Sequence, residues 1–209
     1  LFEVGADYLR VVATDGHRLA METLNIASTV KETQQLILPR KGIMELSRLL
    51  SDEGGDIELT FGQNHIRAAI PEFTFTSKLV DGKFPDYKKV VPTTNDKTLV
   101  VSTKDFISSI ERVASVSLDR KEGVKLIINK DNIQLSVNSA NSGEGNEKIK
   151  AEFSSENLNI SFNSKYVIDI ASEIEDSKLK MSLKDSVSPV LIEDASDKNN
   201  YYVIMPMKI

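Results

Sequence analysis

The chain has 209 residues, enough for one large domain or two of ordinary size, and 40% of them are hydrophobic and 27% charged, as in globular proteins. Cysteine is absent from the sequence, which excludes disulfides, thiolate metal sites and a cysteine nucleophile. The 26 basic and 31 acidic residues give a net charge of −5. This charge argues against a protein that binds nucleic acid over its whole surface, but it allows a local basic surface that does so.

The sequence contains neither an apolar stretch near the roughly 20 residues of a membrane helix nor the layout of a signal peptide. We therefore expect a cytoplasmic protein without membrane contact. The chain opens on Leu1 inside a segment that looks structured, and its first methionine is Met21. We expect a fragment whose natural start is missing.

The first predicted element is a β-hairpin. Leu9 to Ala13 and Arg18 to Met21 form its strands, and Asp15-Gly16 forms its turn, because this dipeptide tolerates positive φ. The hairpin looks like the tail of a repeated unit whose earlier strand and helix are missing.

Three later stretches resemble one another, and each carries a lysine near the start of a predicted helix. These lysines, Lys41, Lys104 and Lys165, are spaced 63 and 61 residues apart. Positions two, three and nine residues after each lysine are apolar, which predicts one helix face directed at a core. The residues are Ile43, Met44 and Leu50; Phe106, Ile107 and Val113; and Val167, Ile168 and Ile174.

A β-rich segment precedes each helix, and three segments with strand periodicity follow it, so the unit is β-α-β-β-β. Two units that join their sheets and cover one side with two helices make a domain of about 120 residues. The turn-rich stretch Pro92 to Lys97 is the expected linker. We therefore predict an α+β protein with an N-terminally incomplete domain over 1–95 and a complete domain over 97–209.

The repeated lysines have two interpretations. A lysine at a helix start is slightly unfavourable because of the helix dipole, so descent from a duplicated ancestor explains it without any function. Alternatively, successive helices present basic side chains to one anionic surface such as a nucleic-acid backbone. That surface would use Arg40, Lys41, Arg48, Lys104, Arg112 and Lys165, although Glu45, Glu111, Asp169 and Glu173 on the same helices dilute the signal.

An enzyme has little support in the sequence. Asp15 and His17 are the one acid/base pair that can be imagined, but His17 follows a hairpin turn, where a structural or contact role is more common. His65 begins an ordinary strand. Phosphate-binding glycine loops, metal-ligand spacings and nucleophile elbows are missing from the sequence. We expect no catalytic residue, no metal and no cofactor.

The last predicted strand, Tyr201 to Met205, leads into Pro206 and Met207. Proline ends sheet pairing, and methionines at a terminus suit partners of varied sequence. The alternative is that both methionines are core residues, as strand alternation allows for Met205.

Three motifs together resemble one protein family. They are Ala13 to Ala20 (ATDGHRLA), Phe75 to Tyr87 (FTSKLVDGKFPDY) and Tyr202 to Ile209 (YVIMPMKI), and they are similar to the bacterial DNA sliding clamps, the beta subunits of DNA polymerase III. The resemblance runs from residue 1 to 209. It implies three domains of two units each, with two subunits closing head to tail into a ring around duplex DNA, sheets outside and helices inside. The chain would then hold most of the middle domain and the whole C-terminal domain.

The resemblance implies a non-catalytic processivity factor that tethers polymerases to DNA without reading its sequence. Clients of this family insert a short peptide into a pocket between the middle and C-terminal domains. Transferred residue by residue, the pocket consists of Thr14, Gly16, His17, Arg18, Leu19, Pro85, Lys89, Val90, Val203, Met205, Pro206 and Met207. The expected half of the ring interface in this chain is Ser115, Val116 and Leu118, with Val116 as the apolar anchor.

The partners implied by the resemblance are duplex DNA, a second clamp subunit, the polymerase III alpha subunit, the clamp-loader delta subunit, translesion and repair polymerases, mismatch-repair proteins and ligase. The protein would be cytoplasmic and associated with the nucleoid during replication. Lys89 and Lys208 stand where the family often has arginine, and Pro189 stands where a small polar residue is common near the pocket rim.

Two other hypotheses remain. A peptide-binding scaffold unrelated to replication would show no loss of DNA loading when Lys41, Lys104 and Lys165 become glutamate in the full-length protein. An enzyme that uses Asp15 and His17 would lose turnover in His17→Gln.

Overall fold

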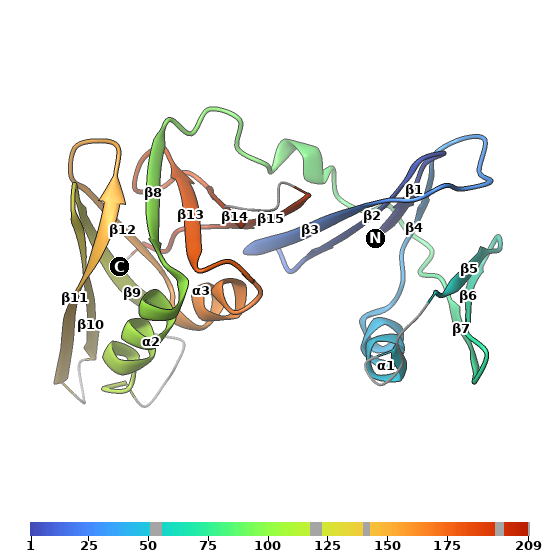
Figure 1. The fold of residues 1–209 in the computed structure, drawn as a ribbon, viewed down its shortest axis with the longest axis horizontal. Helices are drawn as coiled ribbons and strands as arrows, with labels where there is room; N and C mark the ends of the chain where they lie inside the picture. Colours follow the sequence, from blue (N-terminus) through green and yellow to red (C-terminus); the bar gives the residue numbers. More distant parts are fainter. Residues whose placement is uncertain (51–55, 118–122, 140–142, 195–198, 209) are drawn as a thin grey trace. The chain divides into compact units, whose positions relative to one another are not determined.

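The computed structural model describes residues 1–50, 56–117, 123–139, 143–194 and 199–208. The chain separates into two compact units (Figure 1): Leu1–Val12 with Thr23–Pro85, and Ala13–Glu22 with Asp86–Ile209. The predicted hairpin consists of β2 (Tyr8–Thr14) and β3 (Arg18–Asn25), and its tip is assigned to the second unit.

In the first unit, a short strand that the sequence did not predict, β1 (Phe2–Val4), pairs antiparallel with β2 and with β4 (Gln34–Leu36). Helix α1 (Arg40–Leu50) follows, and β5 (Glu58–Phe61), β6 (His65–Ala69) and β7 (Thr74–Lys78) form an antiparallel sheet. The core of this unit is small and contains Phe2, Val4, Leu9, Leu38 and Ile66.

The second unit holds two complete β-α-β-β-β repeats. The first is β8 (Lys97–Ser102), α2 (Thr103–Ala114), β9 (Gly123–Asn129), β10 (Asn132–Ser139) and β11 (Gly143–Phe153). The second is β12 (Leu158–Asn163), α3 (Ser164–Ala171), β13 (Lys178–Leu183), β14 (Val190–Asp194) and β15 (Asn200–Ile204). The strands pair antiparallel in the order β12-β9-β10-β11-β8-β13-β14-β15. This arrangement and the α1 repeat confirm the predicted α+β fold.

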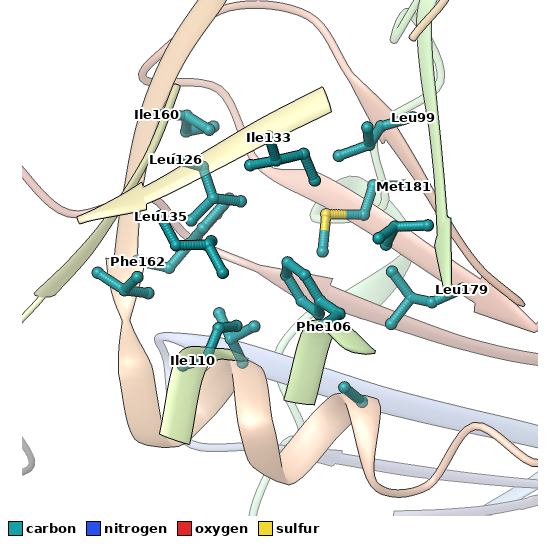
Figure 2. Packing of buried hydrophobic residues seen from close by; sticks show 14 of the residues in the cluster. Leu99, Phe106, Ile110, Leu126, Ile133, Leu135, Ile160, Phe162, Leu179 and Met181 are labelled. Carbon is teal, nitrogen blue, oxygen red and sulfur yellow. The ribbon is translucent and has the colours of Figure 1, made fainter. Parts of the chain in front are cut away.

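A single large core fills the space between the helices and the strands of the second unit. Figure 2 shows Phe106 and Ile110 of α2 pointing at residues of several strands, among them Leu135, Leu179 and Met181. α2 and α3 pack beside each other (Figure 1). Because the repeated helices place apolar residues on one face, one layer of helices covers one face of the strands.

The predicted apolar stripe is wrong at one position. Three residues after the repeated lysine, Met44 is 60% exposed, whereas Ile107 and Ile168 are only half-buried. In α2 and α3 the buried face includes the residue before the lysine and the residue two after it, and the position three after the lysine is turned by about 100° from the latter. The buried positions are Leu46 in α1; Thr103, Phe106, Ser109, Ile110, Val113 and Ala114 in α2; and Ser164, Val167, Ile170 and Ala171 in α3.

Two further boundaries differ from the prediction. α3 ends at Ala171, so Ile174 lies beyond the helix, although it is still buried. β11 starts at Gly143 rather than Lys148, because its glycine-rich half pairs with β10. A Cβ atom on Gly145 would lie 2.7 Å from the carbonyl oxygen of Val113. Glycine therefore lets the end of α2 approach this strand closely.

Candidate functional site

The tip of the β2–β3 hairpin is a tightly bonded turn. Gly16 has φ of 87°, which a side chain would disfavour. The Asp15 carboxylate accepts hydrogen bonds from the backbone N–H groups of His17 and Arg18, both at 3.0 Å, and the Thr14 hydroxyl donates to the carbonyl of Arg18 at 2.7 Å. These bonds fix the backbone from which His17 and Arg18 project.

The C-terminal strand β15 pairs with this hairpin. Arg18 lies opposite Ile204 and Leu19 opposite Val203, and the backbone N–H of Met205 donates to the carbonyl of His17 at 2.9 Å. Leu19 and Val203 are buried. The structure thus brings the hairpin and the C-terminal strand of the predicted pocket into direct contact.

Beyond β15, the chain leaves the sheet with its methionines accessible. The backbone N–H of Met207 donates to the carbonyl of Ser161 in β12 at 2.7 Å, which anchors the segment after Pro206. Met205 and Met207 are each 37% exposed, so neither is a core residue. Among the described residues of the second unit, the large apolar side chains classed as exposed are Val90, Val187, Met205 and Met207.

Helix α3 contributes two residues that the sequence interpretation did not include in the pocket. The Arg18 guanidinium lies 4.3 Å from the centre of the Tyr166 ring, and the His17 ring stacks on Tyr166 with centroids 6.2 Å apart. Arg18 Nη1 donates to Asp169 Oδ2 at 2.7 Å, and its Nε donates to Asp15 Oδ2 at 3.1 Å. The sequence did contain one indication: Tyr166 and Asp169 are three residues apart in a predicted amphipathic helix, so their side chains lie on the same face.

These contacts shift two pKa values. Partial burial alone would raise the pKa of Asp15, but hydrogen bonds from His17 and Arg18 outweigh it and hold this pKa below its usual range. Partial burial alone would lower the pKa of Arg18, but the hydrogen bonds to Asp169 and Asp15 raise it. The pair is therefore fully charged at neutral pH. The Asp15 carboxylate bonds the backbone N–H of His17 rather than its ring, so the imagined acid/base pair does not form.

The remaining residues of the predicted pocket lie on different elements. Lys89 ends the short 3₁₀ helix Tyr87–Lys89, and its Nζ lies 3.1 Å from Asp86 Oδ2. Val90 follows and is exposed, whereas Pro85 belongs to the first unit. Pro189 is half-buried, and its carbonyl accepts a hydrogen bond from Asn95 Nδ2 at 3.0 Å. Lys208 is exposed.

The three repeated lysines occupy equivalent places. Lys41, Lys104 and Lys165 are each the second residue of a helix, and each is exposed. Ser102 caps α2 by accepting from the backbone N–H of Asp105, and Asn163 caps α3 by accepting from that of Tyr166. Lys104 and Lys165 therefore project from the capped ends of two helices that pack together.

The other predicted DNA-facing residues are less uniform. Arg40 is exposed at the first position of α1. Arg48 pairs with Glu45 on the same helix, and Arg112 Nε donates to Glu147 Oε2 at 2.9 Å. The hydrogen bond to Glu147 raises the pKa of Arg112. Both arginines are partly neutralised by a carboxylate in this structure.

The predicted ring contact lies at the end of α2. Ser115 caps the helix and is exposed, whereas Val116 is half-buried and packs against the core. Leu118 lies outside the described residues. Over residues 143–150, β11 pairs with β10 on one edge, while its pairing with β8 covers only residues 151–153.

Other kinds of site find no support in the described parts of the chain. Clusters of three or more histidine or acidic side chains that could hold a metal ion do not occur there. The helices within the described ranges are all too short or too polar to cross a bilayer. Two hollows on the second unit lie away from the predicted pocket, one beside the start of α2 and one where β8 meets β11.

Comparison with known proteins gives consistent matches along the chain. The family model of the DNA polymerase III beta subunit central domain matches residues 1–86, and that of its C-terminal domain matches residues 88–208. The beta sliding clamp of Pseudomonas aeruginosa is 40% identical over the whole chain, which covers 57% of that relative.

Solved structures agree with these matches. A crystal structure of a Pseudomonas aeruginosa DNA polymerase sliding clamp is 40% identical with a TM-score of 0.95, over 100% of this chain and 57% of that one. A Bartonella birtlesii sliding clamp bound to griselimycin is 42% identical with a TM-score of 0.93, over 97% of this chain and 55% of that one. The chain spans less than two thirds of the length of these relatives. It belongs to the DNA polymerase III beta subunit family, the bacterial sliding clamps, as its three sequence motifs predicted.

Proposed function

We propose that this chain is part of a non-catalytic sliding clamp, a ring that encloses duplex DNA and tethers polymerases and other clients through a peptide-binding site. The observation that carries the proposal is the exposed apolar surface beside the hairpin tip, in a chain of this family. Met205, which bonds the backbone of His17, and Met207, two residues later, remain accessible, and His17 and Arg18 both contact Tyr166. A linear peptide with apolar anchors suits such a surface.

The peptide site combines a rigid frame with adaptable side chains. The hairpin turn and its pairing with β15 fix the backbone, while methionine side chains adjust to different partners. Val90, Val203 and Leu19 belong to the same proposed site, with Thr14, Gly16, Pro85, Lys89 and Pro206. To these we add Tyr166, because it contacts both His17 and Arg18.

The proposed contact with DNA uses the exposed lysines at the helix starts. Lys104 and Lys165 project from two packed helices, and ammonium groups meet phosphates without reading sequence. Arg40 and Lys41 are the equivalent residues in the first unit. Arg48 and Arg112 contribute less, because carboxylates already pair with them. Weak contacts of this kind let a ring slide.

The proposed ring contact pairs this chain with a second clamp subunit. Ser115 and Val116 lie at the end of α2, and residues 143–150 of β11, which within the described parts of the chain pair along one edge only, approach that helix end at Gly145. An open strand edge is a template for pairing with another chain. We also propose that the turn-rich stretch Pro92 to Lys97 links a middle domain over 1–95 to a C-terminal domain over 97–209, although the match to the C-terminal family model already starts at residue 88.

The proposed clients are those of the family: the polymerase III alpha subunit, the clamp-loader delta subunit, translesion and repair polymerases, mismatch-repair proteins and ligase. They would share one short apolar motif and compete for one site. The proposed location is the bacterial cytoplasm.

Fluorescence anisotropy with a fluorescein-labelled peptide of the QLxLF type tests the proposal. The unaltered chain should bind, and Met205→Ala and His17→Ala should each weaken binding by roughly tenfold, as expected for anchor residues. Met44→Ala is the matched control, because Met44 is exposed in α1 outside the proposed site. A peptide that fails to bind, or that binds both altered chains as tightly as the original, would contradict the proposal.

A further inference from the structure

The side chain of Arg18 contacts three other side chains, although it is partly exposed. Its Nη1 lies 2.7 Å from Asp169 Oδ2, its Nε lies 3.1 Å from Asp15 Oδ2, and its guanidinium covers the Tyr166 ring. The three charged side chains are partly exposed, with 29% of Arg18, 43% of Asp15 and 41% of Asp169 accessible. Three partners from two elements therefore determine the position of one side chain.

We propose that Asp169 is a positioning residue of the client-peptide site, which holds the Arg18 guanidinium over Tyr166 and so fixes the surface that His17, Arg18 and Tyr166 form together. This inference rests on the proposed peptide-binding function and adds a residue to it that does not touch the client itself.

The geometry of α3 makes Asp169 suited to this role. Asp169 follows Tyr166 by three residues, so the two side chains lie on the same face of the helix. Asn163 caps the helix through the backbone N–H of Tyr166 and fixes its first turn. Arg18 reaches across from the hairpin and spans both side chains. The carboxylate at one end and the ring beneath determine the tilt of the guanidinium plane.

The Asp15 contact alone leaves Arg18 free to turn. Asp15 belongs to the same hairpin turn as Arg18, three residues earlier, and holds only Nε. Asp169 is the carboxylate that ties Arg18 to another element. Without it, Nη1 would lose this acceptor and the long side chain would regain rotamers that leave the ring. A mobile Arg18 must then be ordered again when a peptide binds, which lowers affinity.

The same contacts bear on which clients the site prefers. Two carboxylates within hydrogen-bond distance already compensate the charge of Arg18. Arg18 therefore offers a client a flat, ordered surface rather than an unpaired cation. The contrary role, in which a client carboxylate displaces Asp169 and pairs with Arg18, predicts that removing Asp169 strengthens the binding of acidic peptides.

Peptide affinities of the 209-residue chain distinguish these roles. Two fluorescein-labelled QLxLF-type peptides, one with serine and one with aspartate at the variable position, are titrated in anisotropy experiments. Asp169→Asn should weaken both by roughly threefold to tenfold, and Asp169→Glu should recover part of the loss. Glu175→Gln is the charge-matched control, since this exposed acid lies beyond α3, and it should bind both peptides normally.

The thermal midpoint of Asp169→Asn should match that of the unaltered chain, which separates positioning from a loss of fold. Unchanged or stronger binding by Asp169→Asn overturns the inference while leaving the proposed function intact. If the unaltered chain binds neither peptide, the proposed function fails and the positioning role fails with it.

A second measurement needs no peptide. In a ¹⁵N spectrum of the guanidinium groups, Arg18 should give separate Nη–H signals, because the bond from Nη1 to Asp169 and the ring beneath restrict rotation about its Cζ–Nη bonds. Asp169→Asn should merge these signals into an averaged one, whereas Glu175→Gln should not. Averaged Arg18 signals in the unaltered chain would show that Asp169 does not hold the side chain, and would overturn the inference.

Discussion

The second unit contains two apolar regions that differ in their access to solvent. Beneath α2, Phe106 and Met181 are fully buried among the strands (Figure 2). At the end of β15, Met205 and Met207 stay partly exposed beside a hairpin tip fixed by hydrogen bonds. The same residue type thus occurs as filler of the core and as accessible surface. A buried region of this kind contributes to stability, whereas the exposed region is the part that we propose for peptide binding.

Removal of a buried core side chain should reduce stability most. Phe106→Ala should lower the free energy of unfolding by about 3–5 kcal/mol, because it removes a fully buried ring and leaves a cavity. Chemical denaturation followed by circular dichroism measures this loss. Met205→Ala, at the exposed region, should stay within about 0.5 kcal/mol of the original chain. Similar losses for the two exchanges would remove the distinction between the regions.

Loss of the Asp15 charge at the hairpin tip should reduce stability less. The pKa of Asp15 is held below its ordinary value of 3.8, so the folded hairpin favours the charged carboxylate. The stability that this carboxylate contributes is present above pH 3.8 and is lost as the pH falls through the lower folded value. The thermal midpoints of the original chain and Asp15→Asn should therefore differ at neutral pH and converge below pH 3.8. A constant difference across this range would contradict the assignment.

Local pattern predicted most of the fold, because each repeated helix and strand has its own apolar periodicity. It missed β1, a three-residue strand too short to show a period, and the glycine-rich half of β11, whose pairing with β10 and close approach to α2 decide its conformation. Met44 was predicted to face the core because it is apolar and adjoins other apolar residues of the helix. Apolar periodicity alone does not show on which residues the buried face is centred.

The candidate site was predictable only in part. His17, Arg18 and Met205 were named from motifs, but Tyr166 and Asp169 are far from the hairpin in sequence and reach it only through the fold. In the sequence, Asp169 was interpreted as one of the acidic residues that dilute the basic charge of the repeated helices. In the structure, it pairs with Arg18. Contacts between distant segments are set by the pairing of β15 with β3, which periodicity does not reveal.

The methyl spectrum of the five methionines reports whether a peptide binds at the C-terminal strand. Each residue reports a different environment: Met21 and Met181 are buried, Met44 is exposed on α1, and Met205 and Met207 lie at the exposed region. On addition of an unlabelled QLxLF-type peptide, the signals of Met205 and Met207 should shift and saturate together, while those of Met44 and Met181 stay in place. Shifts confined to Met44, or an unchanged spectrum at saturating peptide, would contradict a peptide-binding site at the C-terminal strand.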